Sequence, residues 1–406
     1  MMKFSAAEIK QVRQLAEKVK AAADSHENAE ICARWHNVNG LRKPDRAPVW
    51  CRPVACWDEL LPKDSLVCQD PFLQSMEYEF KQILIKKEIN DDSPLTSYYP
   101  VQAQYDVIPE NRWGLDIGKF TSHEKGGAWG YNPPIKAHED LRKLVRPRFI
   151  FNPARTEQLF EDTQRVIGDI LPAKMMLDPG YDNATLGTAA ADLRGLEQMM
   201  LDMICEPSLM HKLMAYLRDV KQEELNTWEQ NPLLSPNTTG PMLCSDSIGS
   251  VGDKISLKNC WCAGNSQEFD QVSPAMWEEF CLDYQRPIFE RFGYVCYGCC
   301  ENLTHKIDGV LSIPNLRIFV CSAWTDIDVV LNKINKNYCI MWRQKASDVV
   351  CTDDLKMLRN QMEEGLRKLQ GQYYQIVLRE LQTLAGNLDR LHVWTAMAKE
   401  LAAKYS

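Results

Sequence analysis

Apolar residues recur at two different spacings along the chain, and the two spacings alternate after about residue 100. Short apolar or aromatic runs predict strands at 148–151, 293–297, 317–322 and 338–342. Apolar positions three and four residues apart predict helices at 155–170, 195–205, 208–229, 274–292, 352–369 and 388–404. This alternation is typical of βα units and suits a (β/α)8 barrel, which usually takes about 250 residues. A doubly wound open sheet is the alternative.

The first hundred residues follow a different pattern. Helical spacing predicts amphipathic helices at 5–24 and 71–87, with a segment rich in Pro and Trp between them. No strand here leads into a Gly-rich phosphate loop. The expected organisation is an α/β protein with a mainly helical N-terminal extension over residues 1–100 and a (β/α)8 TIM barrel over residues 101–406.

Composition narrows the class of protein. The net charge of -8 argues against nucleic acid, because binding to phosphates needs a basic face. No apolar run approaches the roughly 18 residues of a membrane span, and the charged N-terminus does not suit a signal peptide, so we expect a cytoplasmic protein without a membrane partner. The 15 cysteines lack the regular spacing of a secreted disulfide scaffold, and most are expected to be reduced thiols.

The segment Tyr297-Gly298-Cys299-Cys300-Glu301 ends one of the predicted strands. Because side chains alternate across a strand, Tyr297, Cys299 and Glu301 are expected to face one cavity at the C-terminal end of the barrel. A carboxylate is seldom buried without a partner, which favours a functional role for Glu301. For the cysteines, the alternative is that they are small buried hydrophobic residues.

Other polar residues lie where βα loops would present them. Gln267 and Glu268 precede the helix predicted from 274, and Glu268 could equally be a solvated loop acid. Trp324 and Asp326 follow the strand predicted at 317–322, where Asp326 is equally explained as the N-cap of the next helix. His305 lies one helical turn beyond the Cys-Cys-Glu segment, and its alternative is a surface residue. Motifs of serine hydrolases, P-loop enzymes and zinc proteases are missing from the sequence.

Three stretches resemble the uroporphyrinogen decarboxylase superfamily, and within it the branch of corrinoid-dependent methyltransferases. They cover residues 193–211, 266–280 and 297–326, and Tyr-Gly-Cys-Cys-Glu is the most specific motif. The resemblance implies a (β/α)8 barrel with its site at the C-terminal mouth. The Arg-Gln-Ala-Gly-Arg motif of the decarboxylases has no counterpart here. Where the thiol-methylating branch has His-x-Cys, this chain has Tyr297-Gly298-Cys299.

The resemblance therefore implies an O-demethylase-type methyltransferase. It would pass a methyl group from a small donor, such as an aromatic methyl ether or a methylamine, to the cobalt of a separate corrinoid protein. The resemblance suggests zinc as a cofactor, and it also admits a homodimer. The candidate catalytic acids are Glu268 and Glu301; the candidate zinc ligands are Cys299, Glu301 and His305; the candidate substrate contacts are Gln267, Tyr297, Trp324 and Asp326.

This hypothesis predicts that Glu268 and Glu301 share one pocket, together with a metal ion or a retained proton, because two nearby carboxylates repel. Two alternatives stay open. A lyase of the same fold acting on a small carboxylic acid requires a cationic clamp, from Arg148, Arg317 or Arg343. A non-catalytic barrel that binds a corrinoid or tetrapyrrole requires neither glutamate.

Overall fold

The computed structural model describes residues 4–121, 129–250, 252 and 254–406. Its strands are β1 (Val49–Cys51), β2 (Tyr99–Gln102), β3 (Tyr105–Ile108), β4 (Gly118–Thr121), β5 (Trp129–Asn132), β6 (Arg148–Phe151), β7 (Ala173–Met176), β8 (Trp261–Gly264), β9 (Tyr294–Tyr297), β10 (Leu316–Cys321), β11 (Cys339–Arg343) and β12 (Tyr373–Leu378). Six of them form one parallel sheet in the order β1-β12-β11-β10-β9-β8. The others pair in twos: β2 with β7 in parallel, β3 with β6 and β4 with β5 antiparallel.

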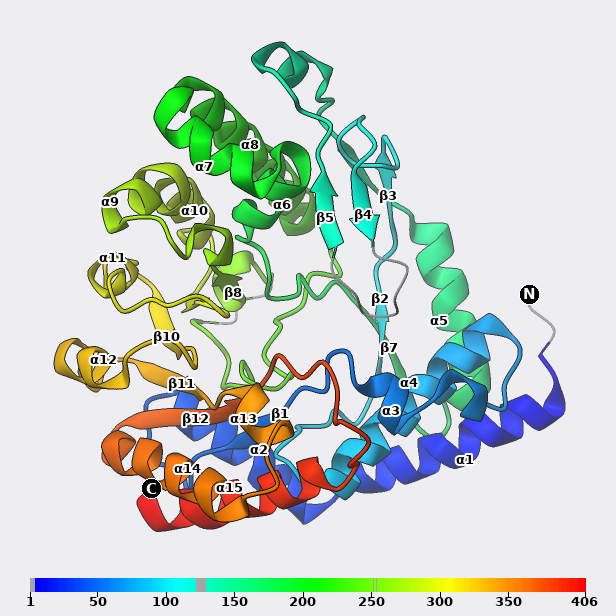
Figure 1. Cartoon of the computed structure of the whole chain (residues 1–406). Coiled ribbons are helices and arrows are strands. Elements are labelled where there is room, and N and C mark those ends of the chain that lie inside the picture. The colour runs from blue at the N-terminus through cyan, green and yellow to red at the C-terminus, as the bar shows by residue number, and fades with distance from the viewer. Residues whose placement is uncertain (1–3, 122–128, 251, 253) are drawn as a thin grey trace.

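Helices lie around the curled six-stranded sheet and the smaller strand pairs (Figure 1). They are α1 (Ala6–Ala23), α2 (His26–Asn39), α3 (Trp57–Leu60), α4 (Pro71–Ile89), α5 (Pro153–Ile167), α6 (Leu186–Arg194), α7 (Leu196–Cys205), α8 (Pro207–Gln230), α9 (Pro274–Trp277), α10 (Asp283–Phe289), α11 (Ile307–Leu311), α12 (Ile327–Lys333), α13 (Ala346–Val350), α14 (Leu355–Leu369) and α15 (Arg390–Tyr405). The single helix predicted at 274–292 is two helices joined by a π-helical turn. The other predicted helices are confirmed to within a few residues.

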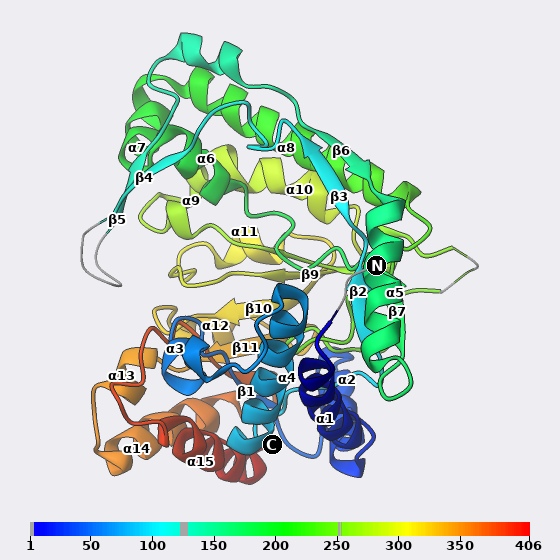
Figure 2. The same cartoon turned by 90° about the vertical axis from the view of Figure 1, so that its right-hand side faces the viewer.

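Alternation along the strands separates two apolar layers. In β10, Ile318 and Val320 belong to a cluster on the inner side of the sheet, which also contains Trp261. Their neighbour Phe319 belongs to the larger cluster between the sheet and the helices. A third, smaller cluster joins α1, α4 and α5, which lie side by side in Figure 2. The sheet is therefore buried on both faces, as parallel sheets require.

The strands predicted at 293–297, 317–322 and 338–342 are confirmed as β9, β10 and β11. The run at 148–151 is also a strand, but it pairs antiparallel with β3 and lies outside the main sheet. Across the described ranges, the strand pairings do not close into a ring. The structure thus shows an α/β protein with a helical N-terminus and a curled parallel sheet.

The first hundred residues, which were expected to form a mainly helical extension, also contain β1, and this strand pairs with β12. Asp92 fixes β1 there, because its carboxylate accepts the Val49 N–H at 2.7 Å and its own N–H donates to the Val49 carbonyl. Arg34 and Arg46 pair with the same buried carboxylate at 2.9 and 2.6 Å. The N-terminal segment therefore contributes a strand to the sheet as well as helices.

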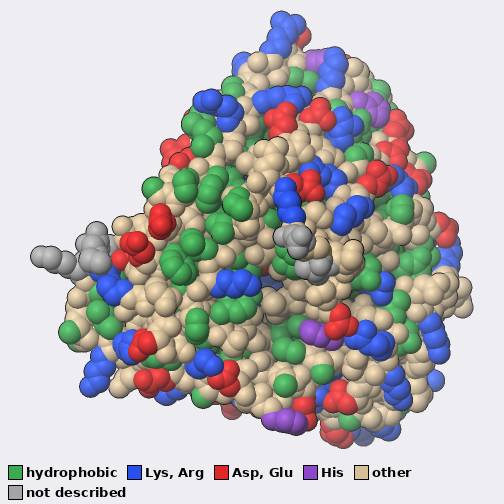
Figure 3. Space-filling model, turned by 180° about the vertical axis from the view of Figure 1, so that it is seen from behind, with side chains coloured by type: hydrophobic (Ala, Val, Ile, Leu, Met, Phe, Trp, Pro, Cys, Tyr) green, Lys and Arg blue, Asp and Glu red, His purple; other side chains and the backbone are tan. Residues whose placement is uncertain are grey.

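The surface charges, the hydropathy of the helices and the state of the cysteines can be compared with the expectations from composition. Acidic and basic side chains are intermixed over the face seen in Figure 3. No helix within the described ranges is both long and apolar enough to cross a membrane. All 15 cysteines are free, which confirms the expectation of reduced thiols.

Candidate functional site

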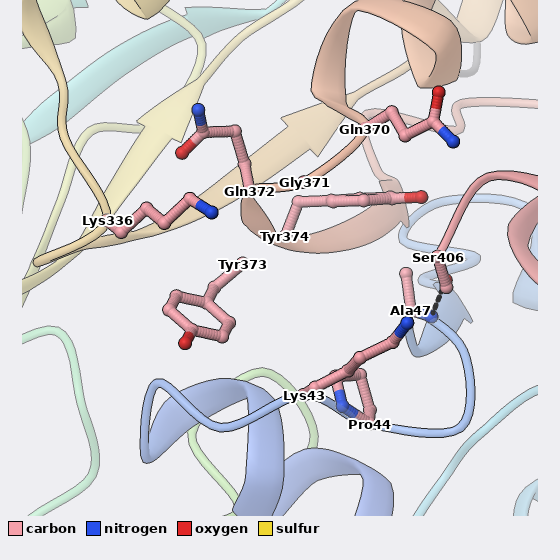
Figure 4. A pocket seen from close by; sticks show the side chains of 10 residues that line it. All are labelled: Lys43, Pro44, Ala47, Lys336, Gln370, Gly371, Gln372, Tyr373, Tyr374 and Ser406. Carbon is pink, nitrogen blue, oxygen red and sulfur yellow. Dashed lines mark hydrogen bonds between the residues drawn. The ribbon is translucent and has the colours of Figure 1, made fainter.

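The structure offers hollows at both ends of the parallel sheet. One of about 370 Å³ lies where β12 begins, and Lys43, Lys336, Tyr373 and Tyr374 line it (Figure 4). In βα folds, catalytic residues come from the carboxyl ends of the strands, and the opposite end serves stability. The candidate site is therefore the cavity at the carboxyl ends.

That cavity is bounded by residues that end the strands or follow them closely. Its inner wall consists of apolar side chains, among them Met242, Leu243, Cys296 and Met341. Its polar lining is made by Tyr181, Asp182, Asn265, Cys299, Arg343 and Arg379. Several βα units thus converge on one place, as expected for a site at the mouth of a barrel-like sheet.

Gly298 turns the chain at the end of β9. Its φ of +116° is a conformation that side chains rarely adopt, and an added Cβ would lie 2.9 Å from both Val320 and Leu303. The turn interrupts the alternation of the strand, so Cys299 lines the cavity together with Cys296. Glycine is required here because both the backbone conformation and the space demand it.

Cys299, Cys300 and Glu380 form a cluster that could hold a metal ion, with one ligand atom from each within 4.8 Å of the others. The two sulfurs are 3.5 Å apart, and Cys300 Sγ lies 3.4 Å from Glu380 Oε1. Arg343 Nη1 donates to the Cys299 carbonyl and to Glu380, each at 2.7 Å. The side chain of Arg343 is 1% exposed and that of Glu380 is 34% exposed, so the ion pair is buried on the arginine side and open to water on the carboxylate side.

The two adjacent thiols have very different acidities. A hydrogen bond from Cys300 lowers the pKa of Cys299 to about 6, and the positive charge of Arg343 acts in the same direction. The same hydrogen bond and burial raise the pKa of Cys300 far above its ordinary value. The lowered pKa of Cys299 favours its thiolate, which is the form that attacks electrophiles and binds metals.

Glu301 lies beneath the cavity and does not line it. Its side chain is buried, with Oε1 accepting the Ser266 N–H at 2.7 Å and Oε2 accepting the Cys299 N–H at 2.9 Å. Burial raises the pKa of its carboxyl group in spite of these bonds. Both oxygens are committed to backbone amides, so Glu301 positions the Cys299 turn.

The expected pairing of Glu268 with Glu301 is not seen. Glu268 Oε1 accepts a hydrogen bond from Thr188 at 2.7 Å, and its other oxygen is buried without a partner among the described residues. No hydrogen bond in the described ranges joins Glu268 to Glu301, and neither carboxylate lines the cavity. The physical reason is that Glu301 is held by the backbone of the loop that follows β8. Gln267, the neighbour of Glu268, is exposed.

Tyr297 also differs from the expectation. It is fully buried in the layer between sheet and helices, and its hydroxyl donates to Gln285 at 3.1 Å and accepts from Trp277 at 3.2 Å. It therefore faces away from Cys299, because alternation puts Cys296 on the inner side of β9 and Tyr297 on the outer side. Its contribution is to packing.

The remaining candidates lie away from the cavity. Asp326 caps α12, accepting the N–H groups of Asp328 and Val329 at 2.9 and 3.3 Å. Trp324 is 58% exposed and has the Lys345 ammonium group over its ring. His305 is exposed. Of the predicted ligands Cys299, Glu301 and His305, only Cys299 belongs to the cluster with Cys300 and Glu380 that could hold a metal ion among the residues described.

Sequence reasoning missed Asp182, Arg379 and Glu380. Arg379 and Glu380 directly follow β12, whose six residues, mostly buried, form an apolar run that could have been taken for a strand. Asp182 follows β7, where Lys174 interrupts the apolar run and Pro179-Gly180 marks a turn. These residues could have been identified as the polar residues that follow the apolar runs of β12 and β7.

Comparison with known proteins adds nothing to the geometry of the cavity and the cluster described above. Neither a protein-family model nor a curated protein sequence matches the chain.

Proposed function

We propose that this protein is an enzyme that transfers a methyl group from a small donor to the cobalt of a separate corrinoid protein. The observation that carries the proposal is the cluster of Cys299, Cys300 and Glu380 beside a cavity at the carboxyl ends of parallel strands. The family resemblance of the Tyr-Gly-Cys-Cys-Glu segment supports the same reaction class. The proposal includes no bound corrinoid, since the cobalt arrives on the partner.

The cluster also suits a zinc ion. Zinc prefers thiolate, imidazole and carboxylate ligands, and a catalytic site offers three of them and leaves one position open. Two thiolates on one tetrahedral zinc lie about 3.8 Å apart, given Zn–S bonds of about 2.3 Å. The observed separation of 3.5 Å is close to that value. When bound there, zinc would supply a Lewis acid that stabilises the leaving oxygen of the donor.

The chain's own residues account for the rest of the transfer. The carbon–oxygen bond of the donor breaks, the methyl carbon bonds to cobalt(I), which supplies the electron pair, and the leaving oxygen takes a proton. Asp182 is the proposed proton donor, because partial desolvation outweighs the nearby arginines and raises its pKa. Arg343 holds both Glu380 and the Cys299 carbonyl and so keeps the cluster in place.

We further propose that the curled sheet belongs to a closed (β/α)8 barrel. Leu177, directly after β7, forms a parallel bridge with Leu234. The side chain of Asn237 accepts the Trp261 N–H of β8 at 2.7 Å. These bonds support a path from β8 to β7 and on to its partner β2, so that only the gap between β2 and β1 remains. An experimental structure with β2 beside β1 would test the closure.

The methyl-transfer proposal is tested by an assay with reduced corrinoid protein and a panel of methoxylated aromatics and methylamines. Methylation of cobalt is followed by its absorption spectrum. We expect transfer from at least one donor and a loss of about a hundredfold or more in Cys299→Ala. Absence of transfer from every donor, or full activity of Cys299→Ala, would contradict the proposal.

Metal analysis tests the cluster separately from activity. The purified protein is expected to hold about one zinc ion per chain, and Cys299→Ala, Cys300→Ala and Glu380→Gln should each lose it. Cys296→Ala is the matched control, because this thiol lines the same cavity but lies outside the cluster. Equal zinc content in all four variants would place the metal elsewhere.

A second candidate function is a lyase acting on a small carboxylic acid. It is favoured by Arg343, which lines the cavity and would have to exchange its ion pair with Glu380 for one with the substrate. The other two arginines considered are elsewhere: Arg148 is exposed on β6, and Arg317 lies over the ring of Tyr294 near the start of β10. Release of CO2 from small acids without any corrinoid protein would replace the first proposal with this one.

A further inference from the structure

Arg379 lines the cavity, and Arg52, which is not part of the lining, approaches the same tyrosine. In the described part of the chain, both lack the ion-pair partners that such residues usually have. Arg52, directly after β1, and Arg379, directly after β12, are both half-buried, and within the described ranges neither forms an ion pair with a carboxylate. Arg343, by contrast, is paired with Glu380 at 2.7 Å. Guanidinium groups withdrawn from water are normally paired, because desolvation of an uncompensated charge is costly.

Both guanidinium groups converge on one hydroxyl. Arg52 Nη1 lies 3.4 Å and Arg379 Nη2 3.3 Å from the oxygen of Tyr181. A phenol oxygen can accept from two donors and still donate its own proton. Strand order explains the meeting, since β1 and β12 are neighbours in the sheet and end at the same edge. Two positive charges are thus held close together, with a hydroxyl donor between them.

Asp182, Cys299 and Glu380 are the acidic groups near these arginines: Cys299 and Glu380 act on Arg379, and Asp182 is affected by both arginines. Asp182 feels the charges of Arg379, Arg52 and Arg343, yet it forms no ion pair with any of them in the part of the chain described. The free volume beside these groups is about 10 Å³, about that of one water molecule, so a larger group can enter only if the side chains that line the cavity move. A group bound here would leave the rest of its molecule at the open mouth, on the side of Cys299.

We infer that the substrate of this cavity carries an anionic oxygen group, a carboxylate or a phosphate, which binds between Arg52 and Arg379 with Tyr181 as a further donor. Planar guanidinium groups match the paired oxygens of such anions. The binding of the anionic group does not depend on the proposed function. Only the reaction at the other end of the substrate, the methyl transfer, rests on it. For methyl transfer, the donor would then be a methoxylated or methylated acid.

Calorimetric binding to the full chain tests the anion site without any corrinoid protein. The probes are 3-methoxybenzoate, its neutral counterpart 3-methoxybenzyl alcohol, and inorganic phosphate. We expect the acid to bind at least about tenfold more tightly than the alcohol, since a hydrogen bond to a charged group is worth at least that factor. Tighter binding of phosphate than of the acid would support the anion site and identify a phosphate ester as the substrate.

Substitutions assign the binding to the two arginines. Arg52→Gln and Arg379→Gln should each weaken binding of the acid about tenfold or more. Arg317→Gln is the matched control, because this arginine lies over the Tyr294 ring away from the cavity and should leave affinity unchanged. Circular dichroism verifies that each variant is folded.

Equal affinity for acid and alcohol, or unchanged binding in both Arg52→Gln and Arg379→Gln, would overturn the inference. If the acid binds and methyl transfer fails, the anion site stands and the methyl-transfer function falls. If methyl transfer succeeds with neutral donors alone, the methyl-transfer function stands and the anion site falls.

Discussion

The carboxylate of Glu301 has a structural role, because it binds backbone N–H groups of two loops. Each of its oxygens accepts one backbone N–H, from Ser266 and from Cys299. In Glu301→Gln, the amide group would face one of these N–H donors with a donor of its own. We expect a loss of about 1 to 3 kcal/mol in the free energy of unfolding, measured by urea denaturation.

Glu290→Gln serves as the control for that prediction. Glu290 is exposed, so its substitution should change stability by less than about 0.5 kcal/mol. Equal stability of Glu301→Gln and the unsubstituted protein would show that the two amide bonds do not hold the Cys299 turn.

Cys32 provides a pH-dependent test of how α2 packs on the inner side of the sheet. A hydrogen bond from the buried Cys244 lowers the pKa of Cys32 to about 7. Because the pKa is lowered, the thiolate appears as pH rises through about 7, and alkylation of Cys32 by iodoacetamide should accelerate over that range. In Cys244→Ala the midpoint should move upward. Peptide mass spectrometry measures the rate, and an unchanged midpoint would refute the contact.

At the residue scale, the sequence predicted some site residues and not others for identifiable reasons. Cys299 was predicted at the cavity and lies there, whereas Tyr297 and Glu301 were assigned to the same face by strict alternation. Gly298 breaks that alternation through its backbone conformation, which cannot be derived from residue type alone. Arg379 was missed because β12 had not been recognised as a strand.

Among the elements, α12 bears on whether Asp326 is a substrate contact or the N-cap of a helix. The carboxylate caps the helix, and nothing in the cavity lining includes it. Asp326→Ala should cost about 1 kcal/mol of stability, and Asp326→Asn much less, because asparagine is an equally good cap. Thermal unfolding measures both. A large loss of methyl transfer in Asp326→Asn with unchanged stability would favour a role in substrate binding.

Elements of sufficient length were predictable, and short ones were not. α1 and α8 carry apolar positions at regular helical spacing over 18 and 24 residues, and both were predicted nearly to their ends. β1 has only three residues, too few for a pattern. The strand β6 was recognised, but its pairing with β3 depends on contacts between residues forty or more positions apart, which a local pattern does not encode.

For the whole molecule, the contribution of β1 predicts that residues 101–406 do not form a stable unit by themselves. Removing residues 1–100 deletes β1 and leaves one side of β12 without its hydrogen-bonding partner. Exposed edges of this kind promote aggregation. We expect the shortened chain to be insoluble or to lack cooperative unfolding, as judged by sedimentation and circular dichroism. A soluble, cooperatively folding fragment would restore the boundary at residue 100.

The pairing of β1 with β12 also determines when the main sheet can form during synthesis. Val49 is paired with Ile376, so the partner of β1 is synthesised 327 residues later. At about 5 to 20 residues per second, a ribosome needs roughly 15 to 65 s to reach it. Throughout that interval the nascent chain has an unpaired strand, and the main sheet can be completed only after β12 has been synthesised. Such a chain depends on chaperone protection during synthesis, and its folding in the test tube should be slowed by the closure of this long-range contact.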